Sequence, residues 1–126
     1  MAKTAIYEGL LGLIFVTLSN HNLLLRRRLR VAIGDANDVV LIRATRAHAN
    51  FSEYVPIALI RICFLESIRY AQLSIHLLCG ALVTGRVVHA YGVDQVSENH
   101  KLRVVGMALA LAVISSTSVR LRSAYM

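Results

Sequence analysis

The chain is poor in cysteine, proline and acidic residues, and it contains no tryptophan. Two cysteines in 126 residues exclude a disulfide-stabilised scaffold. The single proline, Pro56, and the short polar connectors leave no stretch that resembles an interdomain linker, so we expect one domain over residues 1–126. The five histidines lack the close pairing of zinc sites, and no metal site is predicted.

Long hydrophobic runs dominate the sequence instead. The hydrophobic share is 56% and the mean hydropathy is +0.58, which is too apolar for a soluble domain of this size. Four segments, 5–25, 39–65, 70–91 and 102–119, each approach the ~20 residues that a helix needs to span a bilayer. The sequence therefore predicts an all-α fold, an integral membrane four-helix bundle with the lipid bilayer as its surroundings.

The formal net charge of +7 has to be reconciled with this membrane assignment. The basic residues lie beside or within the hydrophobic segments, without a soluble domain to form a groove for nucleic acid, so nucleic acid is not an expected partner. Arginines at 26, 27, 28 and 30 follow the first segment directly, which is the wrong order for a cleavable signal peptide. The positive-inside rule places this run and the loop with Lys101 in the cytoplasm, with both termini outside.

The first half of segment 39–65 carries polar residues at helical spacing. Arg43, Arg46, Asn50, Glu53 and Tyr54 fall within an arc of about 100° on one helix face. Ionisable residues inside a membrane segment are energetically unfavourable and indicate a functional site by default. This face is therefore the first candidate for a binding site.

Three more polar residues are expected near the same membrane surface. Arg86 and His89 share a face near the end of segment 70–91, and Arg103 lies in the first turns of the last segment. Independent snorkelling arginines would occur at both ends of the helices, so convergence at one end favours a shared pocket at the cytoplasmic leaflet. Guanidinium groups with a carboxylate, an amide and an imidazole suit a peptide-like zwitterion that has two carboxylates.

Other residues have simpler interpretations. We expect Cys63 and Cys79 to be buried, inert thiols. Gly9 and Gly12 have the spacing that permits close helix approach. Aspartates at 35 and 38 are both suited to cap the start of the second helix.

The polar motif itself has a family resemblance. The run RAHANFSEYVP at 46–56, preceded by RVAIGD at 30–35 and followed by GRVVH at 85–89, resembles the membrane-associated proteins in eicosanoid and glutathione metabolism, the MAPEG family. Microsomal glutathione transferases and prostaglandin E synthase belong to this family, and the chain most resembles its small bacterial inner-membrane members. The resemblance covers nearly the whole chain.

The resemblance implies a homotrimer that binds glutathione, as co-substrate, between neighbouring protomers near the cytoplasmic face. Arg103 matches the family's arginine that activates the sulfur at the start of the fourth helix. A guanidinium that lowered a thiol pKa of ~8.5 by about two units would contribute roughly 2.7 kcal/mol toward the thiolate. By analogy, the residues that hold glutathione are Arg30, Arg46, His48, Asn50, Glu53, Tyr54, Arg86 and His89.

One departure from the family pattern bears on activity. Relatives often carry a tyrosine one turn after the position of His89, where this chain has Val93. Tyr91 is close in sequence, but in a continuous helix it points about 140° away from Arg86, so the tyrosine's role is not carried over.

These observations predict a membrane-bound glutathione transferase that conjugates glutathione to lipophilic electrophiles entering from the bilayer. Peroxidase activity is a further reaction open to the same pocket. A non-catalytic lipid- or glutathione-binding membrane protein of the same fold is the alternative. A small transporter subunit, whose arginines guide anions, is a weaker third hypothesis.

Overall fold

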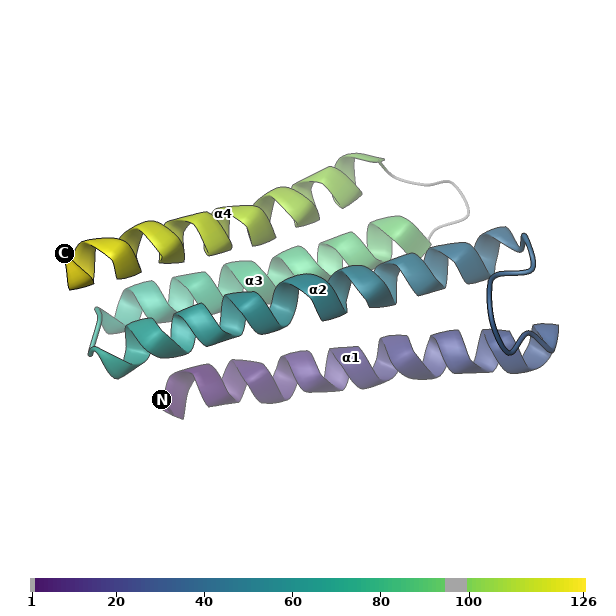
Figure 1. Cartoon of the computed structure of the whole chain (residues 1–126), viewed down its shortest axis with the longest axis horizontal. Helices are drawn as coiled ribbons and strands as arrows, with labels where there is room; N and C mark the ends of the chain where they lie inside the picture. The colour runs from purple at the N-terminus through teal and green to yellow at the C-terminus, as the bar shows by residue number, and fades with distance from the viewer. Residues whose placement is uncertain (1, 95–99) are drawn as a thin grey trace.

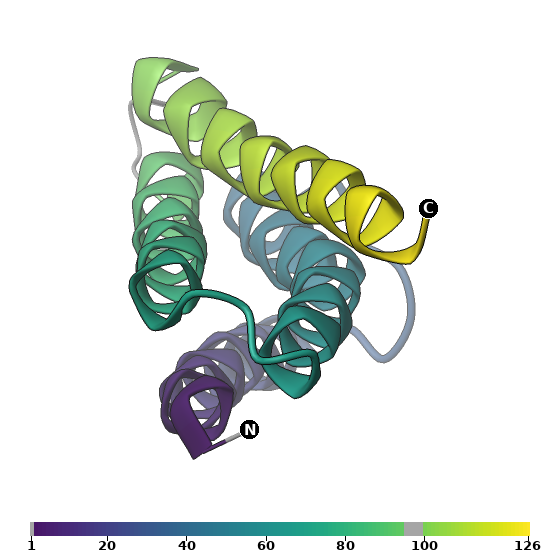
Figure 2. The same cartoon turned by 90° about the vertical axis from the view of Figure 1, so that its left-hand side faces the viewer.

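The computed structural model describes residues 2–94 and 100–126, which form four α-helices with no strand among them. The helices are α1 (Ala2–Leu29), α2 (Val39–Ser67), α3 (Gln72–Asp94) and α4 (His100–Tyr125). They lie side by side along the long axis of the molecule (Figure 1). The end-on view places α1 and α4 on opposite sides of the bundle (Figure 2). The all-α four-helix prediction is confirmed.

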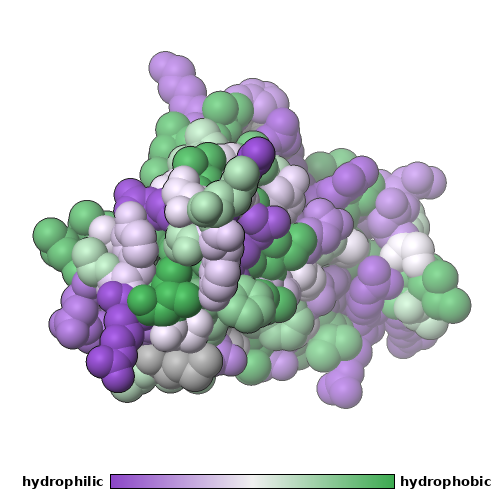
Figure 3. All heavy atoms as spheres, turned by 60° about the vertical axis from the view of Figure 1, so that its left-hand side comes forward, coloured by the Kyte–Doolittle hydropathy of each residue, from purple (hydrophilic) through white to green (hydrophobic). Residues whose placement is uncertain are grey.

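Three of the helices are long and apolar enough to cross a membrane: α1, α4 and residues Gln72–Val93 of α3. The 29 residues of α2 extend about 43 Å, which is sufficient in length, but this helix carries charged residues along both halves. Because α2 lies beside the other three, a bilayer that they cross is crossed by α2 as well. Large hydrophobic side chains are exposed among polar ones on the face seen in Figure 3.

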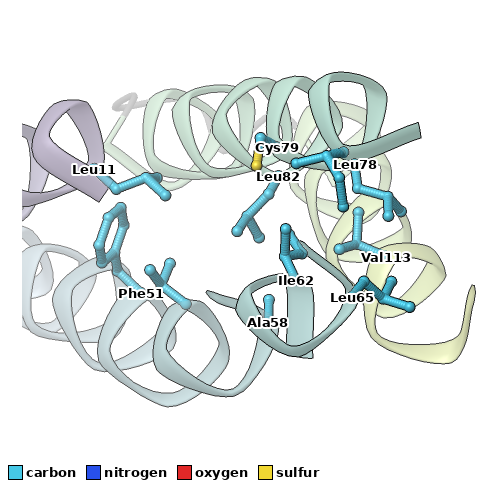
Figure 4. Close-up of a cluster of buried hydrophobic side chains, with 11 residues drawn as sticks. Leu11, Phe51, Ala58, Ile62, Leu65, Leu78, Cys79, Leu82 and Val113 are labelled. Carbon is cyan, nitrogen blue, oxygen red and sulfur yellow. The ribbon is translucent and has the colours of Figure 1, made fainter. Parts of the chain in front are cut away.

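The interior of the bundle is a cluster of buried side chains from all four helices (Figure 4). Leu11 of α1 and Val113 of α4 meet Phe51 and Ile62 of α2 and Leu82 of α3 in this cluster. Cys79 is fully buried within it, and Cys63 is half-buried. Both are free thiols, and the expectation of a buried thiol is confirmed for Cys79 but only in part for Cys63.

The connector between α1 and α2 shows which aspartate caps the second helix. Asp38 is the N-cap, and its side chain accepts a hydrogen bond from the Leu41 backbone nitrogen at 2.8 Å. Asp35 instead accepts from the Asn37 nitrogen at 3.0 Å within the turn. In the connector between α2 and α3, Arg69 has φ 57°. The third helix begins at Gln72, two residues later than the predicted segment 70–91.

Glycines set the distance between α3 and α4. A Cβ atom at Gly106 would lie 2.6 Å from both the Gly85 carbonyl oxygen and the His89 Cβ, so the two helices meet backbone to backbone there. The close approach expected at Gly9 and Gly12 is not found within the chain, since a Cβ at either position would meet no described atom within 4 Å. Among the described residues, the glycines that permit close helix approach are therefore on α3 and α4.

The start of α1 and the end of α2 meet at one end of the bundle. The Glu66 carboxylate near the end of α2 accepts hydrogen bonds from the backbone nitrogens of Lys3 and Thr4, each at 3.1 Å, and from the Thr4 hydroxyl. The first turn of α1 contains no acidic residue. A carboxylate from another helix therefore satisfies two of the free N–H groups at the start of α1.

Candidate functional site

A polar hollow of about 660 Å³ lies at the end of the bundle away from the two termini. Its walls come from the first half of α2, the last turns of α3 and the first turns of α4. The volume falls within the range typical of small-molecule sites. The lining residues are Val39, Ile42, Arg43, Arg46, Ala49, Asn50, Glu53, His89, Val93, Arg103 and Met107.

Positive charge predominates in the hollow. Arg43, Arg46 and Arg103 contribute three guanidinium groups, and Glu53 contributes the one carboxylate among the lining residues. Arg46 and Glu53 are exposed, one on each side of Asn50 along α2. An arrangement with excess guanidinium and a single carboxylate favours a ligand that is mainly anionic but carries one positive group.

Arg86 lies behind the hollow and holds one of its walls in place. Its side chain is 1% exposed, and its Nη1 donates to the Asn50 side-chain oxygen while Nη2 donates to the Gly106 carbonyl at 2.8 Å. The guanidinium also lies over the Tyr54 ring, 5.7 Å from its centroid. Arg86 thus joins α2, α3 and α4 directly behind Asn50.

The buried charge of Arg86 is only partly compensated within the chain. Its Nε is the one fully buried side-chain nitrogen or oxygen without a hydrogen-bond partner in the described ranges 2–94 and 100–126. No described carboxylate forms an ion pair with Arg86. A buried cation beside a positive hollow adds to the attraction for an anion.

His89 connects α3 to the backbone of Arg103. The imidazole is 6% exposed, and its Nδ1 lies 3.1 Å from the Arg103 carbonyl oxygen. At Gly92, one turn further along α3, a Cβ would lie 2.9 Å from the Arg103 backbone nitrogen. The hydrogen bond and the close approach both fix the first turn of α4, and with it Arg103, against α3.

Comparison with known proteins gives a consistent result. The family model for MAPEG matches residues 4–122. The chain belongs to the MAPEG family. It is 37% identical over 90 residues to the inner membrane protein YecN of two Escherichia coli strains, covering 71% of this chain and 68% of YecN. No solved structure matches the sequence.

Most of the residues that the MAPEG resemblance pointed to do meet at one place. Arg46, Asn50, Glu53, His89 and Arg103 line the hollow, and Arg86 and Tyr54 lie behind Asn50. The helical spacing of the polar residues on α2 was therefore sufficient to group that set. The expected position of Arg86, His89 and Arg103 at the same end of the bundle was sufficient to add them to it.

Two residues of the predicted set lie elsewhere in the chain. His48 faces α1, where its Nε2 is 3.0 Å from the Ser19 hydroxyl and its ring is 4.9 Å from that of Phe15. Arg30 is exposed in the connector after α1, beside a shallow hollow that it lines with Arg26. Within this chain, neither side chain lines the hollow with Arg46.

Six lining residues were not among those predicted to hold glutathione, although Arg43 had been placed on the candidate face of segment 39–65: Val39, Ile42, Arg43, Ala49, Val93 and Met107. Arg43 precedes Arg46 by three residues, Met107 follows Arg103 by four, and Val93 follows His89 by four, so each shares a helix face with a predicted residue. Val93 is 4% exposed, whereas Tyr91 is 60% exposed. Tyr91 thus lies on the exposed side of α3, whereas Arg86 on the same helix is buried.

Proposed function

We propose that the protein is a membrane-bound glutathione transferase that uses the hollow between α2, α3 and α4 to bind glutathione. The observation that carries the proposal is the gathering of Arg46, Asn50, Glu53 and Arg103 from two helices around one cavity. Membership of a family that includes glutathione transferases supports it.

The chemistry of glutathione matches the charges in the hollow. The tripeptide has two carboxylates, one ammonium group, two amides and one thiol. Arg43 and Arg46 can pair with the carboxylates, and Glu53 can accept from the ammonium group. Asn50, held by Arg86, presents an amide to the peptide backbone.

Arg103 is the candidate for activating sulfur. Its guanidinium stabilises the thiolate and thereby raises the ionised fraction of a thiol whose unperturbed pKa is ~8.5. The thiolate attacks an electrophilic carbon, a carbon–sulfur bond forms, and the leaving group departs with its electron pair. Apolar lining residues such as Ile42, Val93 and Met107 suit a lipophilic electrophile that arrives from the bilayer.

The proposal includes a homotrimer with glutathione held between protomers. In such an assembly, the exposed Arg30 is available to a neighbouring protomer's ligand, whereas His48 is engaged with Ser19 of its own chain. We further propose that the protein resides in a bacterial inner membrane with the hollow facing the cytoplasm. The name of the relative, inner membrane protein YecN, supports the location. The arginines at 26–30, beside the hollow's end of the bundle, support the orientation.

A non-catalytic glutathione- or lipid-binding protein is the second candidate. Val93 favours it, because a valine cannot donate the hydrogen bond of the tyrosine that relatives often place there. Peroxide reduction is an additional activity to assay beside conjugation.

The decisive experiment measures glutathione binding and turnover on the purified protein in detergent. Arg46→Ala should weaken binding, while Arg122→Ala serves as a matched control, because Arg122 is exposed at the far end of α4. Conjugation to a nitro-substituted aryl chloride separates the two candidates: a protein that binds glutathione but forms no conjugate is the non-catalytic one. Absence of glutathione binding would contradict both glutathione-based proposals.

A further inference from the structure

The hydrogen bond of His89 determines where its ring proton lies. A carbonyl oxygen can only accept, so the 3.1 Å contact between Nδ1 and the Arg103 carbonyl requires the proton on Nδ1. In the neutral imidazole, Nε2 then carries the lone pair. His89 is thus held in the tautomer whose outer nitrogen can accept a proton.

Nε2 is available to a molecule in the hollow. His89 is one of the lining residues, and Nε2 has no hydrogen-bond partner within the described residues. Nε2 is also not a fully buried atom that lacks a hydrogen-bond partner. Among the described residues, Arg86 Nε is the one side-chain atom of that kind. The fixed Nδ1 bond leaves the other side of the ring as the one that can meet a ligand.

The charged groups around His89 come from all three helices that form the hollow. Arg86 is on the same helix, Arg103 is on α4, and Arg43, Arg46 and Glu53 are on α2. An isolated imidazolium would be repelled by these guanidinium groups. An imidazolium formed together with a thiolate adds no net charge to the hollow, and so proton transfer from a bound thiol avoids that repulsion.

We infer that His89 is the proton acceptor for the thiol of glutathione, an inference that rests on the proposed function. The sulfur–hydrogen bond breaks, the proton moves to Nε2, and the electron pair stays on sulfur beside Arg103. With an aryl chloride, the sulfur then forms a bond to the ring carbon and the carbon–chlorine bond breaks, releasing chloride. His89 returns its proton to water, which restores the neutral ring.

The other lining groups are less suited to this transfer. Guanidinium groups have no lone pair available for a proton. Glu53 is exposed and is the one carboxylate in the hollow that can neutralise the ligand's ammonium group. Arg103 and His89 therefore have separate tasks: Arg103 stabilises the anion, and His89 receives the proton.

The test uses a variant that keeps the structural bond of His89 and removes its base. In His89→Asn, the amide nitrogen can donate to the Arg103 carbonyl as Nδ1 does, but nothing replaces Nε2. We expect the glutathione Kd to stay within threefold while kcat at pH 7 falls at least tenfold. The deficit should shrink as the pH rises, because solvent then deprotonates the thiol.

A measurement on the unmodified protein tests proton transfer directly. Thiolate formed on glutathione binding is followed by ultraviolet absorbance, and proton release is followed by calorimetric titration in buffers of different ionisation enthalpy. If His89 keeps the proton, the protein releases clearly less than one proton per thiolate formed, and His89→Asn releases one. His89→Gln, which extends an amide toward the Nε2 position, should behave like His89→Asn and serves if that variant does not fold.

The outcomes distinguish this inference from the proposed function. Unchanged kcat and pH profile in His89→Asn, or release of one full proton per thiolate by the unmodified protein, would overturn the role of His89 and leave the transferase intact. A protein that neither binds glutathione nor conjugates it would overturn the proposed function and this inference together.

Discussion

The guanidinium of Arg86 on α3 donates a hydrogen bond to the side-chain oxygen of Asn50 on α2. The same side chain reaches the Gly106 carbonyl on α4, so one buried residue fixes the positions of three helices around the hollow. The wall that faces a ligand and the packing behind it therefore depend on each other.

Replacing Arg86 by lysine should destabilise the bundle. A lysine ammonium lacks the planar fork that reaches both acceptors, and each buried acceptor left unpaired costs about 1–3 kcal/mol. We expect a lower thermal unfolding midpoint in detergent, together with weaker glutathione binding. Arg122→Lys, at an exposed position, is the control, and an equal midpoint in the two variants would contradict the role of Arg86.

Replacing Arg46 or Glu53 by alanine should affect binding alone. Both side chains are exposed in the hollow, so the fold should keep its unfolding midpoint while glutathione binding weakens by about 1–3 kcal/mol. Titration calorimetry measures the affinity. Asn50→Ala should lower both affinity and stability, because Asn50 also accepts from Arg86. Unaltered affinity in all three variants would exclude a shared glutathione site.

Arg103→Ala should lower turnover more than affinity. A contact that acts on the thiolate stabilises the reactive form, whereas other residues hold the ligand's carboxylates. We expect glutathione affinity within a few-fold of the unmodified protein and at least a tenfold lower kcat near pH 7. Part of the loss should be recovered at higher pH, where solvent ionises the thiol. Full activity of this variant at every pH would remove Arg103 from the mechanism.

Gly106→Ala should disrupt the packing of α3 on α4. The added Cβ would lie 2.6 Å from the Gly85 carbonyl oxygen, and a backbone atom cannot move aside as a flexible side chain can. We expect a loss of about 1–3 kcal/mol or more, seen as a lower unfolding midpoint. Gly80→Ala is the matched control, because a Cβ there meets no described atom within 4 Å and alanine favours the helix. Similar midpoints for the two variants would contradict the close approach.

Much of the architecture was predictable because hydrophobic length and helical spacing are local properties. The four segments followed from runs of apolar residues, and the common face of Arg46, Asn50 and Glu53 followed from the 100° turn per residue. The same angle placed His48 on another face, and it contacts Ser19 of α1.

The unpredicted features depend on which helices become neighbours. Spacing alone marks Gly9 and Gly12 as suited to close approach, but it does not specify a partner, and the contact forms at Gly85 and Gly106. Arg30 was grouped with the pocket by resemblance. It lies after the end of α1 with φ 55°, in a connector whose course the hydrophobic pattern does not define.

The contact of Glu66 with Thr4 has a consequence for the order of assembly during synthesis. The acceptor for the first N–H groups of α1 lies 62 residues further along the chain, at the far end of α2. Those groups therefore lack this partner until α2 has been made and has folded back beside α1. The start of α1 is thus completed late, after the helix that follows it in the sequence.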